Sequence, residues 1–175
     1  MPYNEQSVVC SSNSIGMKIL GIDPGLVNTG WCILNKNGNN DIEYIDCGVF
    51  RTKTTDGFGQ KLSYIYNSAI EIISAHYPDE VAMEEVFVNM NPESSKKLIM
   101  ARTASYVAVC NSERFVYEYR PNTIKKNVTG NGHASKLQVF VMIKKIIKGL
   151  PKENIQLSHD STDAMAVALC HAFAR

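Results

Sequence analysis

Apolar residues fall into short runs near the N-terminus of this chain and recur at helical spacing further along it. Short apolar or alternating runs bounded by Gly, Pro, Asn and Asp are typical of β-strands. Such runs predict strands at residues 17–23, 29–35, 43–50, 81–84 and 115–119. The first three strands follow one another across turn-rich connections, which favours antiparallel pairing at the start of a sheet.

Apolar residues three and four positions apart predict helices in the longer segments. In the first of these segments, Leu62, Ile65, Ala69, Ile72 and Ile73 share one face. Four helices are predicted, at residues 58–76, 91–111, 134–148 and 158–174. Three early strands followed by alternating helices and strands predict an α/β domain, in which helices pack on a mixed five-stranded sheet.

The first 16 residues are polar and rich in Ser and Asn. They lack the basic start and the apolar segment of a signal peptide, so we expect residues 1–16 to be a flexible N-terminal extension. The length of the remainder, residues 17–175, suits a single domain. No apolar run approaches the roughly 20 residues that are needed to span a bilayer.

The chain has five cysteines and no C-x-x-C pair. An odd number without metal-ligand spacing argues against both a disulfide framework and a zinc site. Buried free thiols in a reducing cytosol are the simpler interpretation, so we expect a cytoplasmic protein.

Positive charge is concentrated in one part of the chain. The net charge is only +1, but residues 93–148 contain 11 Lys and Arg against 3 Asp and Glu, while the rest has 7 basic and 14 acidic residues. A segment of net +8 beside a remainder of net −7 can form a local anion-binding face. Solvated helix faces explain the same distribution, and charge alone does not decide between the two.

Four carboxylates lie at the edges of apolar elements. Asp23 ends the first strand and precedes Pro-Gly, Glu84 ends the fourth strand, and Asp160 and Asp163 lie three apart at the start of the last helix. Each has an ordinary alternative, which is turn chemistry, a salt bridge or a favourable helix dipole. Glu85 follows Glu84 directly, and alternation along a strand predicts that the two point to opposite faces.

Taken together, these acids predict a metal site. Clustered carboxylates repel one another by about 1 kcal/mol or more per close pair in partly screened surroundings. Hard divalent cations offset that repulsion, and Mg²⁺ prefers oxygen ligands and substrate phosphates. The sequence contains neither a G-x-x-x-x-G-K-[ST] loop nor an H-E-x-x-H motif, which argues against a nucleoside triphosphatase or a zinc protease.

Four blocks of sequence, in order, resemble the bacterial RuvC Holliday-junction resolvases: ILGIDPGLVNTGW, VAMEEVFVNMN, GNGHASKLQV and DSTDAMAVALCHA. The resemblance covers nearly all of residues 17–175. It implies an RNase H-like fold with helices on both faces of the sheet. It also implies a homodimer that cuts four-way DNA junctions by paired symmetric nicks, with two Mg²⁺ per subunit and Mn²⁺ as an acceptable substitute. A branch-migration partner of the RuvA–RuvB type is implied as well.

The resemblance also assigns roles to individual acids. The family's catalytic and metal-binding residues fall on Asp23, Glu84, Asp160 and Asp163. His159 adjoins Asp160, and some relatives use a histidine ligand in this block, so His159 is an alternative ligand.

Three further residues are assigned to DNA binding by the same resemblance. The stacking aromatic falls on Phe87, and the DNA-contacting lysines fall on Lys125 and Lys136, on either side of a Gly-Asn-Gly loop. The alternatives are a core phenylalanine and two exposed lysines, and Lys126 could substitute for its neighbour. The helix at residues 91–111 is our choice for the dimer contact.

Two other functions remain open from the sequence. One is an RNase H-like nuclease that acts on RNA–DNA hybrids or on branched DNA in general. The other is a catalytically silent protein that only binds junctions. Cleavage of four-way junctions, compared with linear hybrids, separates all three hypotheses.

Overall fold

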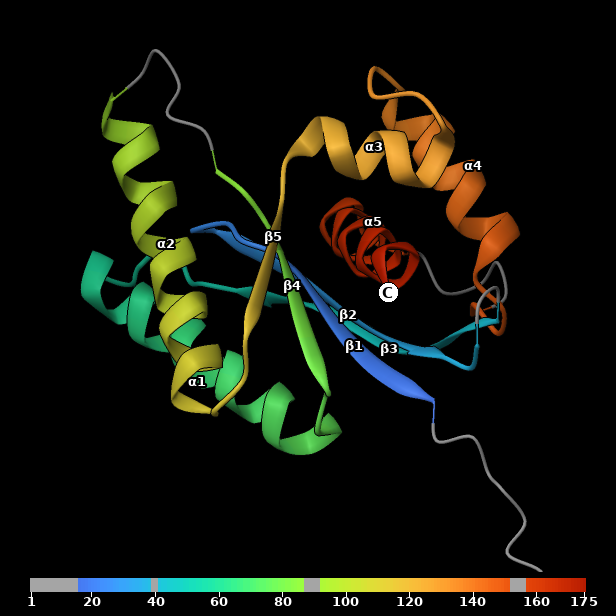
Figure 1. Cartoon of the computed structure of the whole chain (residues 1–175). Coiled ribbons are helices and arrows are strands. Elements are labelled where there is room, and N and C mark those ends of the chain that lie inside the picture. Colours follow the sequence, from blue (N-terminus) through green and yellow to red (C-terminus); the bar gives the residue numbers. More distant parts are fainter. Residues whose placement is uncertain (1–15, 39–40, 87–91, 152–156) are drawn as a thin grey trace, which may run out of the picture.

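The computed structural model describes residues 16–38, 41–86, 92–151 and 157–175. Its strands form one mixed sheet in the order β3-β2-β1-β4-β5 (Figure 1). The first three strands pair antiparallel, as the sequence predicts, and β1, β4 and β5 run parallel, which makes the sheet mixed. The strands are β1 Met17–Asp23, β2 Asn28–Lys36, β3 Ile42–Arg51, β4 Glu80–Glu84 and β5 Val116–Tyr119.

Helices cover both faces of the sheet, and each face has its own apolar core. On one face lie α1 and α2; on the other, α5 lies against the sheet with α3 and α4 around it (Figure 1). The prediction of helices on both faces is therefore confirmed. The helices are α1 Phe58–His76, α2 Pro92–Asn111, α3 Pro121–Thr129, α4 Lys136–Ile146 and α5 His159–Ala174.

The helix α3 was not among the four that the sequence predicts. Pro121 follows the predicted strand at residues 115–119 and takes the first position of this helix, where its missing N–H costs nothing. Only Ile124 and Val128 of the helix are buried, so its apolar pattern is too sparse to predict a helix. The helix carries Lys125, one of the two lysines that the resemblance assigns to DNA binding.

The prediction that α4 extends to residue 148 was wrong. The helix ends at Ile146, and Ile147 is already extended. The next residue pairs with β3: the Lys148 N–H donates to the Ile42 carbonyl at 2.9 Å, and the Tyr44 N–H donates to the Lys148 carbonyl at 2.9 Å. These tertiary hydrogen bonds replace those that a further helical turn would have made.

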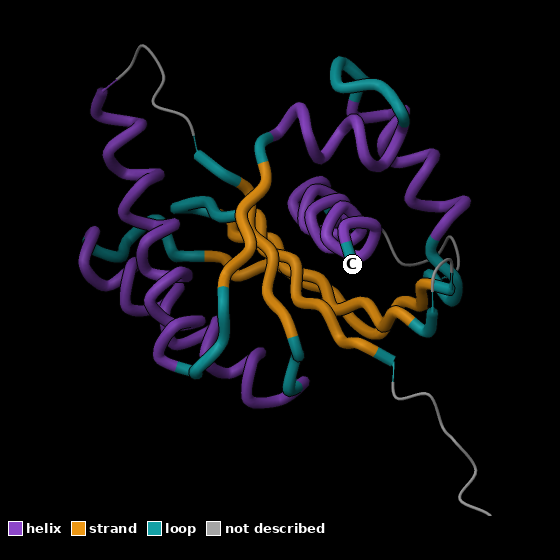
Figure 2. The backbone as a smooth tube through the Cα atoms, viewed as in Figure 1, coloured by secondary structure: helices purple, strands orange, loops and turns teal. Residues whose placement is uncertain are grey.

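The central helix α5 is enclosed between the sheet and the pair α3 and α4 (Figure 2). Most of its buried residues are small, which allows close approach to β1 and β2. Side chains at Gly21 and Gly30 would collide with the α5 backbone at the Ala164 and Asp160 carbonyls, respectively. Two strand glycines therefore let the helix rest directly on the sheet.

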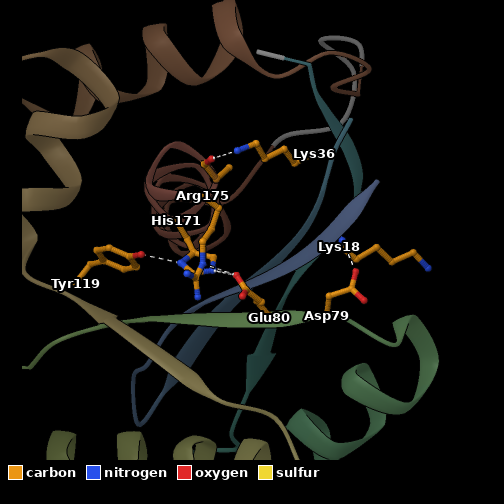
Figure 3. A network of polar contacts seen from close by, with 8 residues as sticks. Lys18, Lys36, Asp79, Glu80, Tyr119, His171 and Arg175 are labelled. Atoms are coloured by element: carbon orange, nitrogen blue, oxygen red, sulfur yellow. Dashed lines mark hydrogen bonds and ion pairs between the residues drawn. The ribbon is translucent and has the colours of Figure 1, made fainter. Parts of the chain in front are cut away.

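A polar network ties the C-terminal end of α5 to β4 and β5 (Figure 3). The fully buried His171 ring bonds the Tyr119 hydroxyl through Nδ1 and the Glu80 carboxylate through Nε2, both at 2.7 Å. Arg175 Nε also donates to Glu80, at 2.8 Å, and its guanidinium lies 4.2 Å from the centre of the Tyr117 ring. Because the ionised Glu80 only accepts hydrogen bonds, His171 donates from Nε2 and accepts the Tyr119 hydroxyl proton at Nδ1.

The structure bears only in part on two predictions about the whole chain, which concern the N-terminal extension and membrane-spanning segments. The first strand begins at Met17, and residues 1–15, predicted as most of a flexible extension, lie outside the described residues. Within the described ranges, none of the helices is both long enough and apolar enough to cross a membrane.

Candidate active site

Two of the predicted acids meet at one edge of the sheet. The neighbouring strands β1 and β4 run parallel, with Ile22 paired to Met83, so Asp23 and Glu84 lie side by side at their carboxyl ends. Their side chains are hydrogen-bonded to each other. Two carboxyl groups can share a hydrogen bond only if one of them holds a proton, and the pKa of about 8 at Asp23 assigns the proton to that residue.

The first turn of α5 brings two more acids to the same edge. Ser158 caps the helix by accepting a hydrogen bond from the Ser161 N–H at 3.0 Å. Gly30, which is paired with Asp23 across β1 and β2, lets the backbone of Asp160 approach the sheet. Asp163 follows one turn later on α5. The four acids thus come from three elements, which share an edge because two strands end there and one helix begins there.

The electrostatics of the site reflect this crowding. Burial raises the pKa of Asp23 to about 8, and repulsion from Glu84, Asp163 and Asp160 adds to the effect. Burial also raises the pKa of Glu84, with a further contribution from Asp163, although the hydrogen bond with Asp23 opposes the shift. Carboxyls whose pKa values rise in this way are typical of functional sites, because a fold gains no stability from gathering them.

Both predicted DNA-binding lysines lie beside the acids. Lys136, the first residue of α4, pairs with Asp163 at 2.7 Å between Nζ and Oδ2, and this hydrogen bond raises the pKa of the lysine. Lys125 projects from α3. Both lysines, with Glu84 and Asp163, line a hollow of about 210 Å³ whose remaining walls are mostly apolar. We call it the catalytic groove. It joins negative and positive side chains, which suits a metal-assisted reaction on an anion.

The acids have the chemistry of a divalent-metal site. Their ligands are oxygens only, and their mutual repulsion is the kind that a hard cation offsets. As the side chains stand, no three His, Cys, Asp or Glu groups in the described ranges are arranged to hold one ion. The carboxylate oxygens that an ion would need are already engaged, in the Asp23–Glu84 hydrogen bond and in the Lys136–Asp163 ion pair. Binding an ion would therefore require that these contacts open and that a proton leave.

Glu85 and His159, the two alternative ligands that the sequence left open, border the acids but do not line the catalytic groove. Glu85 pairs with Arg120 at 3.2 Å and borders a second hollow, which Asp23 and Glu84 also line. His159 is exposed and lines a different hollow, between α4 and α5, together with Asp163. Phe87, the predicted stacking aromatic, lies outside the described residues.

Sequence reasoning missed one residue that supports the site. Arg102 of α2 donates from Nε to the backbone carbonyl of Glu84 at 3.5 Å. Its guanidinium also pairs with Glu118 of β5 and lies 5.5 Å from the centre of the Tyr106 ring. The arginine therefore links the end of β4, at Glu84, to α2 and β5. Nothing in the local pattern distinguishes it from other charged helix residues.

Comparisons with known proteins identify the family. Residues 19–171 match the family model described as crossover junction endodeoxyribonuclease RuvC. The chain belongs to the RuvC family. A RuvC of Wolbachia sp. subsp. Drosophila simulans is 42% identical over 159 residues, covering 91% of this chain and 96% of that protein. A RuvC of Ehrlichia chaffeensis is 42% identical over 161 residues, covering 91% of this chain and 98% of that protein. The enzyme class that the sequence predicts, a metal-dependent endonuclease, is that of the RuvC family.

Solved structures agree with this assignment. The structure of T. thermophilus RuvC in complex with a Holliday junction substrate matches with a TM-score of 0.82 and 31% identity, covering 90% of this chain and 94% of that one. The yeast mitochondrial Holliday junction resolvase Ydc2 matches with a TM-score of 0.68 at 13% identity, over 90% of this chain and 79% of that one, which shows a common fold. The predicted RNase H-like fold is confirmed.

Proposed function

We propose that this RuvC resolves four-way DNA junctions in recombination and repair, by paired symmetric nicks that leave 5′-phosphate and 3′-hydroxyl ends. The observation that carries the proposal is the meeting of four acids and two lysines at one edge of the sheet, in a chain of this family. Cleavage of a phosphodiester in DNA requires oxygen ligands that hold cations at the scissile bond. It also requires fixed positive charge that binds the neighbouring phosphates.

In this proposal Asp23, Glu84, Asp160 and Asp163 are the catalytic residues and hold two Mg²⁺ per subunit, with Mn²⁺ as a substitute. When bound, such ions supply Lewis acidity that activates a water molecule and offsets charge on the leaving oxygen. Asp23 must then lose its proton, and its pKa of about 8 places that step near physiological pH. The preorganised edge of the sheet holds the ligands in place on rigid elements.

The lysines would bind the DNA backbone. Lys136 is paired with Asp163, so cation binding at Asp163 would free its ammonium group for a phosphate. Lys125, on the α3 side of the groove, would hold a second phosphate. Phe87 keeps its proposed role of stacking on an unpaired base, which its place in the sequence just beyond Glu84 and Glu85 supports.

Two symmetric nicks require two active sites, so we propose a homodimer. The helix α2 supports this assignment, because Ile99, Met100 and Val107 are 40%, 37% and 49% exposed on it. A branch-migration partner of the RuvA–RuvB type and a cytoplasmic location beside the chromosome complete the proposal.

The test is cleavage of a mobile four-way junction in Mg²⁺ by the wild type and by Asp160→Asn. We expect paired nicks from the wild type and a loss of about a hundredfold or more from the variant. The same assay with Glu84→Gln and Glu85→Gln distinguishes the adjacent acids, because only the first should abolish cutting. If the wild type bound the junction but never cut it, the hypothesis of a catalytically silent junction-binding protein would remain. Faster cutting of RNA–DNA hybrids would favour the general RNase H-like nuclease.

A further inference from the structure

The hollow that His159 lines, of about 310 Å³, opens between α4 and the start of α5, next to the catalytic groove. We call it the α4–α5 hollow. The surface that its lining exposes is mostly apolar, although four of the seven lining residues are polar. The lining consists of Lys136, Leu137, Phe140, Leu157, His159, Thr162 and Asp163. Two of these residues, Lys136 and Asp163, also line the catalytic groove, so the Lys136–Asp163 ion pair forms the wall between the two.

We propose that the α4–α5 hollow binds one unstacked nucleobase of the cleaved strand, next to the scissile phosphate. This inference rests on the proposed function, since it names a part of the same substrate. It makes Leu137 and Phe140 specificity-determining residues for branched DNA.

The chemistry of the lining selects the occupant. Phosphates and sugars are polar and belong at Lys136, whereas the faces of a nucleobase are the apolar part of a DNA strand. Phe140 is half-buried and offers an aromatic surface for stacking, with the Lys144 ammonium 5.5 Å from the centre of its ring. Leu137 is 70% exposed at the rim of the hollow, where a base in the hollow would contact it.

The position of the hollow also fits a base. A strand whose phosphate lies at Lys136 and whose scissile bond lies at the acids passes directly over the wall that the hollow shares with the groove. A base attached to that stretch of backbone can turn into the hollow. His159 and Thr162 add hydrogen-bonding groups among the lining residues, which could read the edge of the base.

The energetics explain why this would favour junctions. Extracting a base from regular duplex costs stacking and pairing energy, whereas a base at a branch point has already lost part of both. A binding site for one unstacked base therefore favours the binding of branched DNA over that of linear duplex. It also makes cutting depend on the base at one position.

The experiment uses junctions in which an abasic site replaces each base near the cleavage point in turn. The proteins are the wild type, Leu137→Ser, Phe140→Ser, and Val141→Ser as the matched control on the same helix. Val141 is 41% exposed and does not line the α4–α5 hollow. We expect the wild type to nick about tenfold more slowly when the base at one position is missing. The first two variants should be slow on intact junctions and lose nothing more at that position, whereas Val141→Ser should behave as the wild type does.

A binding measurement keeps the test independent of cutting. A junction with 2-aminopurine at the sensitive position, bound in Ca²⁺, should change its fluorescence with the wild type and not with Leu137→Ser or Phe140→Ser. Nicking without any dependence on a base, or abasic losses that persist in full in both variants, would overturn the proposal. So would a loss of the dimer on sedimentation of Leu137→Ser, which would make a second copy the occupant. A base-dependent signal without nicking would instead refute the proposed function alone.

Discussion

Gly30 of β2 lies against the backbone of Asp160 at the start of α5, where any side chain on the glycine would collide with the Asp160 carbonyl oxygen. The same glycine is the sheet partner of Asp23. One residue without a side chain thus brings together two of the proposed catalytic acids, which come from different elements. The contact is between backbone groups, so a larger residue cannot be accommodated by a change of rotamer.

We therefore expect Gly30→Ala to slow junction nicking by about a hundredfold, because displacing a catalytic group by about 1 Å can cost that much. The free energy of unfolding should fall by about 1–3 kcal/mol, since the helix must move off the sheet. Gly59→Ala is the matched control, because nothing lies within 4 Å of a Cβ built there. Equal nicking rates for the two variants would mean that the close approach does not position Asp160.

The acids themselves could be predicted from sequence because each ends or begins an apolar element, and strand ends and helix starts are visible in the pattern. The contact through Gly30 could not, because a glycine in a strand has many uses and its neighbour in α5 is 130 positions away in the sequence. Arg102 was missed for the same reason: its partners Glu84 and Glu118 lie on other elements. The ordered blocks of the family, and not periodicity, assigned the function.

The elements that were predicted wrongly are those whose boundaries depend on tertiary contacts. The sequence of α3 has two buried apolar positions and a leading proline, which is too little to distinguish a short helix from a loop. The end of α4 is set by hydrogen bonds of Lys148 to β3, which no local signal reveals. The first of these elements borders the catalytic groove, because α3 supplies Lys125 to its lining.

Asp23 should lower the stability of the protein in the presence of a chelator. Its pKa in the fold is about 8, against an ordinary value of 3.8. Between those values the unfolded chain has lost a proton that the folded chain still holds, so the contribution of Asp23 to the free energy of unfolding falls as the pH rises from about 4 to 8. Asp23→Asn has no such proton and should be more stable at pH 7 by about 1–3 kcal/mol.

Urea unfolding in EDTA from pH 5 to 9 measures this directly. Glu71→Gln, at an exposed position on α1, is the control and should keep the wild-type slope. Added Mg²⁺ should stabilise the wild type and not Asp23→Asn, because a bound ion stabilises only the form that holds it. If Asp23→Asn kept the pH dependence of the wild type, the proposed destabilisation of the fold by the clustered carboxylates would be refuted.

Lys136 should have opposite effects on metal binding and on DNA binding. Its ammonium pairs with Asp163 and lowers the pKa values of Asp23 and Glu84. Lys136→Gln removes a competing cation, so the affinity for Mg²⁺ without DNA should rise. Junction affinity should fall, and the slope of log K against log salt should decrease by about 1, because one phosphate contact is lost.

Calorimetry with Mg²⁺ and a salt titration of junction binding check the two effects. The control is Lys145→Gln, on the same helix and exposed but absent from the groove lining. If Lys136→Gln bound Mg²⁺ more weakly than the control, the lysine would be supporting the metal site rather than competing for it.

The buried network around His171 should make the protein sensitive to acid. Burial lowers the pKa of His171 below its ordinary value, although Glu80 opposes the shift. Burial acts to raise the pKa of Glu80, but hydrogen bonds from His171 and Arg175 outweigh it, so that pKa is lowered too. In both cases the unfolded chain binds protons more readily, so stability is lost as the pH falls, first below about 6.5 for the histidine and then below about 4.5 for the carboxylate.

His171→Phe should therefore cost about 2–4 kcal/mol at pH 7.5, because Tyr119 and Glu80 lose a buried hydrogen-bond partner. It should also flatten the pH dependence of unfolding below about pH 6.5, because the titrating ring is gone. His133→Gln, in an exposed loop, is the control and should leave both stability and slope unchanged. The network lies at the far ends of the two elements that carry Glu84 and Asp163, so nicking at pH 7.5 should slow as α5 shifts against β4. A variant that unfolds more easily yet nicks at the wild-type rate would restrict His171 to a role in stability.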